Sequence, residues 1–116
     1  MKVRIKRAYE SPHQHDGYRV LVDRLWPRGV KKTDACINEW WKEIAPSTEL
    51  RKWFSHDPAK WVQFKQRYSD ELEANREALA RFANRVEPGP ITLVYGAKDE
   101  QHNQAVVLKE FIETQI

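Results

Sequence analysis

Asp23, Arg24, Trp26 and Arg28 form one group of chemically useful side chains, and they directly follow the apolar run 20–22. Guanidinium groups are planar forks of hydrogen-bond donors that match carboxylates and phosphates, and a neighbouring aspartate can orient them or act as a base. A buried strand seldom carries charges to its end without a partner. We therefore predict that Arg24 and Arg28 clamp an anion beside Trp26, with Asp23 as a candidate catalytic residue.

A second group follows the apolar run 91–95. Lys98 offers a cation for an anionic group, and His102 is a side chain of the kind that carries protons in acid–base chemistry. A helix begins here, and its positive N-terminal end also suits an anion. We predict Lys98 and His102 as candidate catalytic residues and, as ligand contacts, Tyr95, Asp99 and Asn103.

A third group, Arg51, His56 and Asp57, lies in a segment with helical spacing. If the short helix of this segment folds over the site, Arg51 and His56 complete the wall of a ligand-binding crevice. In the alternative interpretation Asp57 only caps a helix. The aromatic residues of this segment, Trp53 among them, are interpreted as core. The sequence leaves the role of His56 open.

The charged groups also have a structural interpretation. Asp23 can form a salt bridge with Arg24, Arg28 or Arg51, and Asp99 can serve only as a helix cap. Among other candidates, residues 13–16 (His-Gln-His-Asp) are interpreted as a solvated loop, because two imidazoles and a carboxylate in a loop are weak support for a metal site. We predict no metal and no cofactor.

Three strands are expected to position these groups. Residues 2–9 alternate apolar and basic side chains, which indicates a half-buried strand near a sheet edge. Residues 19–25 and 91–95 are short apolar runs, typical of strands buried on both faces. The first run is closed by Pro27 and Gly29, and the second by the turn 96–99.

Four helices are expected between and after the strands. The spacing of Ile37, Trp40 or Trp41, and Ile44 predicts a helix from Thr33 that Pro46 ends. Ser47 can cap a second, short helix, and Asp57 can cap a long third helix that runs to Pro88-Gly89-Pro90. Asp99 or Asn103 can cap the last one. Cys36 is interpreted as a small buried hydrophobic residue.

This order of elements predicts one α/β domain over residues 1–116, with a small, mainly parallel sheet of about three strands flanked by four helices. Two buried strands joined by a helical crossover lie parallel in one sheet. Ligands of open parallel sheets bind beyond the carboxyl ends of the strands. Residues 23–29 and 95–103 should therefore face the same crevice.

The net charge of +3 is unevenly placed. Residues 1–32 hold nine Lys or Arg side chains against three acidic ones, a net charge of +6 for that segment. Such a segment favours an anionic ligand or a nucleic-acid surface, although a basic edge strand that discourages edge pairing explains it equally well. Neutralising Lys2, Lys6, Lys31 and Lys32 is the test of nucleic-acid binding.

Composition places the chain among cytoplasmic proteins. No apolar run approaches the ~20 residues of a membrane span, and the N-terminus lacks the apolar core of a signal peptide. A single cysteine cannot form an internal disulfide, which fits a reducing compartment. The oligomeric state is not determined by the sequence.

Several strings resemble a known family. They are residues 20–29, which contain Asp-Arg-Leu-Trp-Pro-Arg-Gly, together with segments 45–47, 50–58, 64–68, 93–99 and 102–105. Over nearly the whole chain they are similar to the YeaO-like family of uncharacterised bacterial proteins, domain of unknown function 488. The resemblance implies no established activity.

More distant members of that larger family carry an Asp-Val-Arg-x-x-Pro string after the early strand and a cysteine, a glutamate and a His-Arg cluster after the late one. Asp23, Arg24 and Pro27 look like the counterpart of the first string. No cysteine lies near Tyr95, so thiol chemistry is not expected here.

The leading hypothesis is a small cytoplasmic protein that binds an anionic small molecule at the carboxyl ends of the buried strands, with or without a reaction. The alternative is a nucleic-acid-binding module that uses the basic N-terminal third and exposed aromatic rings. A purely structural or interaction role is the third hypothesis, and it gains support if Asp23 pairs with Arg51.

Overall fold

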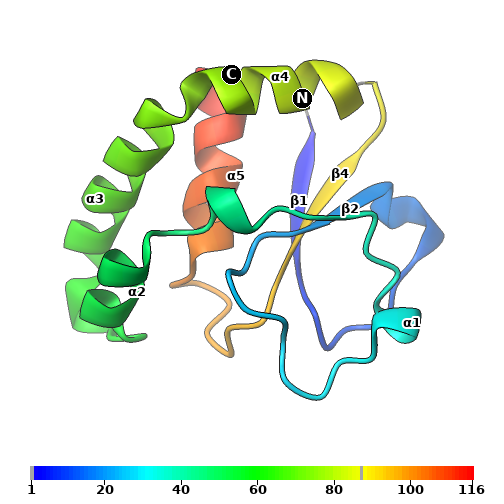
Figure 1. Ribbon diagram of the computed structural model, residues 1–116, viewed down its shortest axis with the longest axis horizontal. Coiled ribbons are helices and arrows are strands. Elements are labelled where there is room, and N and C mark those ends of the chain that lie inside the picture. The colour runs from blue at the N-terminus through cyan, green and yellow to red at the C-terminus, as the bar shows by residue number, and fades with distance from the viewer. Residues whose placement is uncertain (1, 87) are drawn as a thin grey trace.

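The computed structural model describes residues 2–86 and 88–116 as a four-stranded sheet with helices packed on it. The strands are β1 (Val3–Arg7), β2 (Tyr18–Leu21), β3 (Glu39–Trp40) and β4 (Ile91–Tyr95), and all neighbours pair in parallel in the order β1-β4-β2-β3. Figure 1 shows β4 between β1 and β2, the two strands with which it pairs. The α/β class and the parallel pairing of the two buried strands are confirmed.

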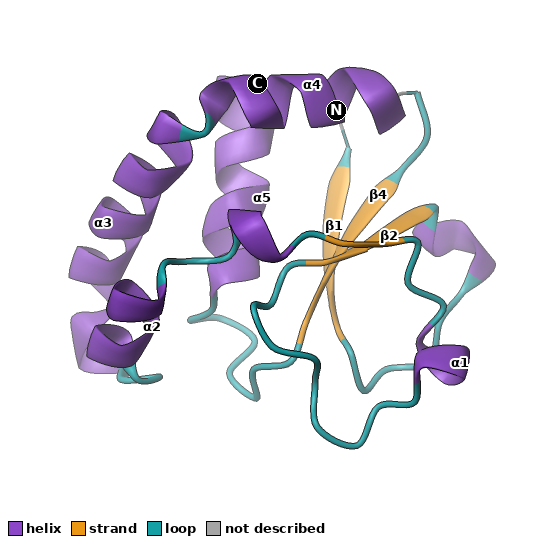
Figure 2. Ribbon diagram, viewed as in Figure 1, coloured by secondary structure: helices purple, strands orange, loops and turns teal. Residues whose placement is uncertain are grey.

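The described helices are α1 (Lys32–Ala35), α2 (Thr48–Phe54), α3 (Trp61–Ala74), α4 (Arg76–Val86) and α5 (Gln104–Gln115). Short 3₁₀ turns occupy Gln14–Asp16, Lys42–Ile44 and Pro58–Lys60. Figure 2 shows α2, α3 and α5 gathered on one side of the sheet, with α4 crossing near the N-terminal ends of the strands. Helix α5 contacts β1 and β4, and α3 packs on α5.

The core lies between the sheet and these helices. Val20, Val22 and Leu93 of the sheet are buried together with side chains of the helices, among them Phe64, Tyr68, Leu72 and Leu108. Trp53 and Trp61 are partly buried and pack against this cluster, so their interpretation as core is confirmed. The Tyr68 hydroxyl donates to the Ile44 carbonyl at 2.7 Å and anchors the chain that leads into α2.

The predicted helix over residues 33–45 is wrong. Helix α1 ends at once, because Cys36 adopts a left-handed backbone with φ of 51°. The chain then extends as β3, and Val20 and Leu21 of β2 pair with Glu39 and Trp40. The apolar spacing is helical, but the segment forms a short edge strand followed by a 3₁₀ turn, because the pairing with β2 outweighs the helical pattern. Cys36 is exposed, which contradicts its interpretation as buried.

The long third helix is divided. Helix α3 ends at Ala74, Asn75 adopts a non-helical backbone, and α4 then begins at Arg76 and runs in a different direction (Figure 1). Strand β2 is also shorter than predicted, since its last assigned residue is Leu21, although the Val22 N–H still donates to the Val94 carbonyl at 3.0 Å. The early end of β2 leaves residues 23–28 as a loop.

Three residues that the sequence predicted as helix caps do cap helical segments in the structure. The Ser47 hydroxyl accepts the Leu50 N–H, the Asp57 carboxylate accepts the Ala59 N–H, and the Asn103 amide oxygen accepts the Val106 N–H. Of the two residues predicted as possible caps of α5, Asn103 is therefore the one that caps it. Each cap satisfies a backbone donor that the first helical turn leaves free.

Candidate functional site

A pocket of about 260 Å³ opens where the loops after β2 and β4 meet α2 and the start of α5. Its walls come from residues 23–28, 45–46, 96–97 and 103–104, from Arg51, Phe54 and His56 on or beside α2, and from Tyr9 and Phe64. The location is the one expected for a parallel sheet, beyond the carboxyl ends of two adjacent strands. The loops after β2 and β4 therefore do face one crevice.

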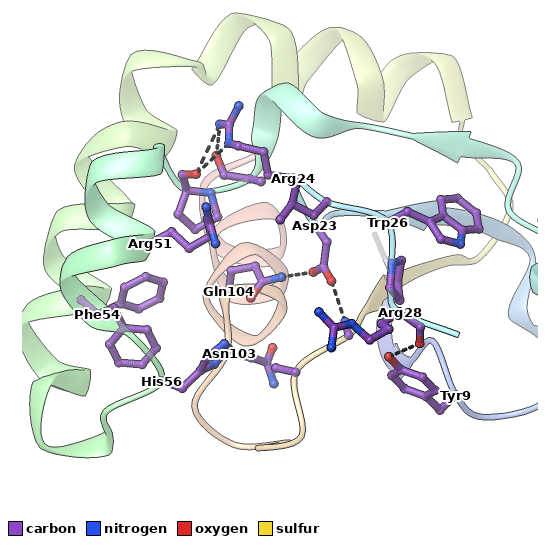
Figure 3. Close-up of a pocket in the computed structure, with 17 residues that line it drawn as sticks. Tyr9, Asp23, Arg24, Trp26, Arg28, Arg51, Phe54, His56, Asn103 and Gln104 are labelled. Atoms are coloured by element: carbon purple, nitrogen blue, oxygen red, sulfur yellow. Dashed lines mark hydrogen bonds between the residues drawn. The ribbon is translucent and has the colours of Figure 1, made fainter. Parts of the chain in front are cut away.

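Asp23 lies at the centre of this pocket (Figure 3). Its Oδ2 accepts the Gly96 N–H at 2.8 Å, and its Oδ1 accepts a hydrogen bond from the Gln104 Nε2. Among the described residues it makes no ion pair, so the salt bridge with Arg24, Arg28 or Arg51 that the alternative interpretation requires is not formed. A carboxylate thus joins the two strand ends without a counter-ion.

Burial raises the pKa of Asp23 to about 6, although the hydrogen bonds from Gly96 and Gln104 lower it. Desolvation disfavours the charged form of a carboxyl group, and no neighbouring cation offsets this cost. The carboxyl group is therefore half protonated at a pH about two units higher than the pH at which an ordinary aspartate is half protonated. It can act as a hydrogen-bond donor at acidic pH and as an acceptor above it.

Gly96 is required by the closeness of Asp23. A Cβ atom at position 96 would lie 2.8 Å from the Asp23 Oδ2, closer than carbon and oxygen atoms pack. The same approach lets the Gly96 N–H reach the carboxylate. The Gly that follows β4 is therefore a site residue, which the sequence pattern alone marks only as a turn.

Arg28 and Arg51 reach into the pocket from opposite sides, Arg28 from the loop after β2 and Arg51 from α2 (Figure 3). Both residues are exposed. Within the described part of the chain, neither guanidinium makes a hydrogen bond or an ion pair, while the Arg28 carbonyl accepts the Tyr9 hydroxyl at 2.8 Å. Two sets of planar donors thus face the same space.

Arg24 lines the pocket but directs its guanidinium elsewhere. Its Nε and Nη2 donate to the Pro46 carbonyl at 3.3 Å, and Nη2 also reaches the Ala45 carbonyl at 3.3 Å. Figure 3 shows this group turned away from Asp23. Arg24 therefore ties the chain before α2 to the loop after β2, and it helps to hold one wall of the pocket in place.

Helix α2 supplies the apolar wall and His56. Phe54 stacks on Phe64 with ring centroids 4.2 Å apart, and both line the pocket. The helix ends in two successive left-handed residues, Ser55 with φ of 46° and His56 with φ of 56°. Such backbone costs roughly 1–2 kcal/mol per non-glycine residue, and here it turns the chain so that His56 lines the pocket.

Trp26 and Asn103 also line the pocket. The Trp26 ring packs edge-on against Trp40 with centroids 5.4 Å apart, and its indole N–H donates to the Val30 carbonyl at 2.7 Å. Asn103 is buried, caps α5 through its oxygen, and donates its Nδ2 to the Asp99 carbonyl at 2.9 Å. Both residues therefore shape the walls, and their polar atoms are already paired.

Four predicted site residues are not among those that line the pocket: Tyr95, Lys98, Asp99 and His102. Lys98 is exposed and Tyr95 is buried in β4. The His102 ring nitrogen lies 2.8 Å from Asp99, and its ring packs edge-on against Trp61. The hydrogen bonds from Gln101 and His102 lower the pKa of Asp99.

Sequence reasoning did not identify Gln104, Gly96 or Phe54 as site residues. Gln104 is a polar residue in the first turn of an amphipathic helix, which is normally a solvent-exposed position. The sequence feature that could have identified Gln104 is its position directly after the capping residue Asn103. The first turn of α5 starts near the carboxyl end of β4, so a side chain at this position can reach the site. Of the third group, Arg51 and His56 do lie in the wall of the pocket, whereas Asp57 caps the turn Pro58–Lys60.

Two further features of the described residues bear on function. No group of three or more His, Cys, Asp or Glu side chains is arranged to hold a metal ion in the part of the chain that the structure covers. Nor does any helix within residues 2–86 and 88–116 combine the length and apolar character that crossing a bilayer requires.

Fold and pocket together define a small parallel α/β protein with a polar pocket at the carboxyl ends of its central strands. Residues 2–116 match the family described as "Inactive DUF488-N3 subclade". The chain is 45% identical to the uncharacterized protein YeaO of Escherichia coli, over 98% of this chain and 99% of that protein. The chain therefore belongs to the YeaO-like family of domain of unknown function 488.

Two mycobacterial relatives have the same extent. The uncharacterized proteins Rv3073c of Mycobacterium tuberculosis and Mb3100c of Mycobacterium bovis are each 38% identical, over 96% of this chain and 93% of theirs. No solved structure gives a significant match. The family is thus assigned from sequence relatives, and it comes without an activity.

Proposed function

We propose that the protein binds a small organic or inorganic anion in the pocket, with Arg28 and Arg51 as the anion-binding groups and His56 beside them. The observation that carries this proposal is the pair of guanidinium groups that reach one pocket and have no partner among the described residues. Guanidinium forks are suited to carboxylate and phosphate groups, and both of these side chains can donate hydrogen bonds to an anion in the pocket.

The size of the pocket supports a small ligand. Pockets for drug-sized molecules are typically ~300–1,000 Å³, and this one is about 260 Å³. A monophosphate or a small carboxylic acid fits this volume, whereas a dinucleotide exceeds it. The first turn of α5 also begins at the pocket, and the positive end of a helix favours an anion.

The proposal is limited to binding. The description of the matching family as an inactive subclade favours a ligand-binding role over turnover. Lys98 and His102, which the sequence suggested for acid–base chemistry, do not line the pocket, so the proposal does not depend on them. Location in the cytoplasm stays a prediction.

A thermal-shift titration at low ionic strength tests the proposal. Inorganic phosphate, small carboxylates and phosphorylated metabolites should raise the melting temperature of the wild type and of the control Arg81→Gln, whose side chain is 74% exposed and remote from the pocket lining. Arg28→Gln and Arg51→Gln should each lose the shift. If no anion stabilises the wild type, or if both variants keep the full shift, the proposal fails.

Nucleic-acid binding is the second candidate, and a particular surface favours it. Trp26 and Trp40 pack together, and a lysine lies over each ring. The Lys32 Nζ is 5.5 Å from the Trp26 ring centroid, and the Lys42 Nζ is 4.0 Å from the Trp40 ring centroid. Aromatic rings among cations suit single strands. The charge of the N-terminal segment is a weaker argument, because Lys6 and Arg19 are paired with Asp16.

Fluorescence anisotropy with labelled single-stranded oligonucleotides discriminates the two candidates. This second candidate requires binding that weakens steeply with salt and that is lost in the double variant Lys32→Gln, Lys42→Gln. Arg51→Gln, a change in the pocket, should then leave oligonucleotide binding unchanged. Flat curves at low salt would remove nucleic acid from consideration.

A further inference from the structure

The Asp23 carboxylate is costly to maintain where it lies. Burial of a carboxylate without a counter-ion is unfavourable, and the two hydrogen bonds from Gly96 and Gln104 offset only part of that cost, as its raised pKa indicates. Each carboxylate oxygen can accept more than one hydrogen bond. Asp23 therefore retains capacity to accept hydrogen bonds while it lines the pocket.

Gln104 adds a second acceptor beside it. Because its Nε2 donates to Asp23, its Oε1 remains as an acceptor that has no hydrogen bond within the described part of the chain. Gln104 also lines the pocket. The centre of the pocket thus presents a carboxylate and an amide oxygen, both acceptors, between the side chains of Arg51 and Arg28 (Figure 3).

Part of the pocket wall is apolar. Phe54 and Phe64 stack on one another there, and Pro46 and Pro27 also contribute to the lining. A ligand that spans the pocket needs a carbon body to cover this wall. Burying such a body is favourable by roughly 25 cal/mol per Å² of apolar surface.

We infer that the ligand is bifunctional: an anionic group binds the pocket arginines Arg28 and Arg51, and an N–H or O–H donor of the same molecule hydrogen-bonds to the Asp23–Gln104 pair. The inference rests on the proposed function, since it names the class of anion that the same pocket selects. Amino acids and hydroxy acids with a short carbon body between the two groups belong to this class.

The competing explanation is that Asp23 only connects the loop after β4 to α5, since Gly96 and Gln104 belong to these two segments. A purely structural Asp23 would affect every ligand of the pocket in the same way. If Asp23 accepts a hydrogen bond from a donor group of the ligand, it distinguishes ligands that have the donor from ligands that lack it. The comparison of matched ligands therefore separates the two roles.

Isothermal titration at pH 7.5 with matched pairs tests the inference: 4-aminobutyrate against butyrate, and 4-hydroxybenzoate against benzoate. The wild type should bind the donor-bearing member of each pair tenfold more tightly or better, because a hydrogen bond to a charged group contributes about 1.5–3 kcal/mol. The proposed function alone requires only that the bare anions bind.

Asp23→Asn is the principal variant. Its amide can still accept the Gly96 N–H and, after rotation of the Gln104 amide, donate to Oε1, so the fold should be kept while the acceptors are lost from the pocket. The preference should fall to threefold or less, and binding of butyrate and benzoate should persist. Gln104→Met, which removes the second acceptor, should also weaken the preference, and it serves if Asp23→Asn does not fold.

The outcomes separate the inference from the proposed function. If the bare anions bind the wild type and the donor-bearing members bind no better, the inference is overturned and the proposed function stands. If the preference survives both Asp23→Asn and Gln104→Met, the donor is read elsewhere and the inference is likewise overturned. If no member of either pair binds, the inference is overturned, and the proposed function is decided separately by the thermal-shift titration with inorganic phosphate.

Discussion

A buried and a half-buried aspartate flank β2, and their surroundings are opposite. Asp16, before the strand, is 5% exposed and forms salt bridges with Arg19 at 2.6 Å and Lys6 at 3.2 Å. Asp23, after the strand, has two neutral hydrogen-bond donors and no cation among the described residues. The carboxylate at one end of the strand is therefore neutralised by two cations, whereas the carboxylate at the other end has no counter-ion among the described residues.

The pKa values express the same difference. Burial alone would raise the pKa of Asp16, but hydrogen bonds from the His13 backbone, Lys6 and Arg19 outweigh it and hold the pKa below its ordinary value. At Asp23 burial prevails and raises the pKa to about 6. A carboxylate that is kept for stability carries its own counter-ions, whereas an unpaired one is more often found at functional sites.

Removal of the Asp16 charge should have the largest effect. Asp16→Asn leaves Arg19, which is 3% exposed, without its counter-ion, and breaking one partner of a buried pair costs about 3–5 kcal/mol. Urea denaturation followed by circular dichroism at pH 7.5 measures the loss. A cost below about 1 kcal/mol would show that this end of β2 is not held by the ion pairs.

The matching change at Asp23 should act in the opposite direction. Asp23→Asn removes a buried charge whose pKa is about two units above the ordinary value, and each unit corresponds to about 1.4 kcal/mol. At pH 8 the free energy of unfolding should therefore increase, by up to about 3 kcal/mol less whatever the weaker hydrogen bonds cost. A clear destabilisation would mean that Asp23 is structural in the same sense as Asp16.

The pH dependence sharpens the comparison. The folded-state pKa of Asp23 is raised from 3.8 to about 6, so the wild type should lose stability as pH rises through this interval and change no further above it on this account. The stability gained in Asp23→Asn should accordingly appear between these values. The pKa of Asp16 is lowered, so its contribution is present above the ordinary aspartate pKa and lost as pH falls through the folded-state value.

Denaturation curves of the wild type and the two variants from pH 2 to pH 8 measure both trends. The penalty of Asp16→Asn should shrink toward acidic pH, whereas the gain of Asp23→Asn should grow toward neutral pH. Parallel shifts of both variants with pH would contradict the assignment of opposite roles.

The smallest effect on stability is expected at the pocket arginines. Arg28→Gln and Arg51→Gln change exposed side chains without partners in the described structure, so the free energy of unfolding should stay within about 0.5 kcal/mol of the wild type. Their effect should be confined to ligand binding. Urea denaturation decides this, and a loss above 1 kcal/mol in either variant would place that arginine in the scaffold.

The sequence predicted one end of β2 better than the other. Asp23 was placed in the crevice because strand ends in a parallel sheet can be located from the apolar runs, and the caps Ser47 and Asn103 located the surrounding helices. The pairing of Asp16 with Arg19 and Lys6 was missed. It depends on how the loop folds onto the strand, whereas the sequence shows these side chains only as part of the net charge of residues 1–32.

The remaining differences have the same origin. The apolar spacing of residues 37–44 is compatible with a helix, and only the pairing of β3 with β2 decides for a strand. Gln104 and Gly96 became site residues because Asp23 lies against them, which is a contact between segments that are far apart in the chain. The local sequence pattern predicts helices and strands, whereas contacts between distant segments can be found only from the three-dimensional structure.

The central claim is that the Asp23 end of β2 binds an anion and the Asp16 end does not. An ¹H–¹⁵N NMR titration with inorganic phosphate tests it most directly. The account expects saturable shifts at Gly96 and at the guanidinium groups of Arg28 and Arg51, with none at Gly17 or Thr92 beside Asp16. Shifts that fail to saturate, or that are as large at Gly17 and Thr92 as in the pocket, would contradict it.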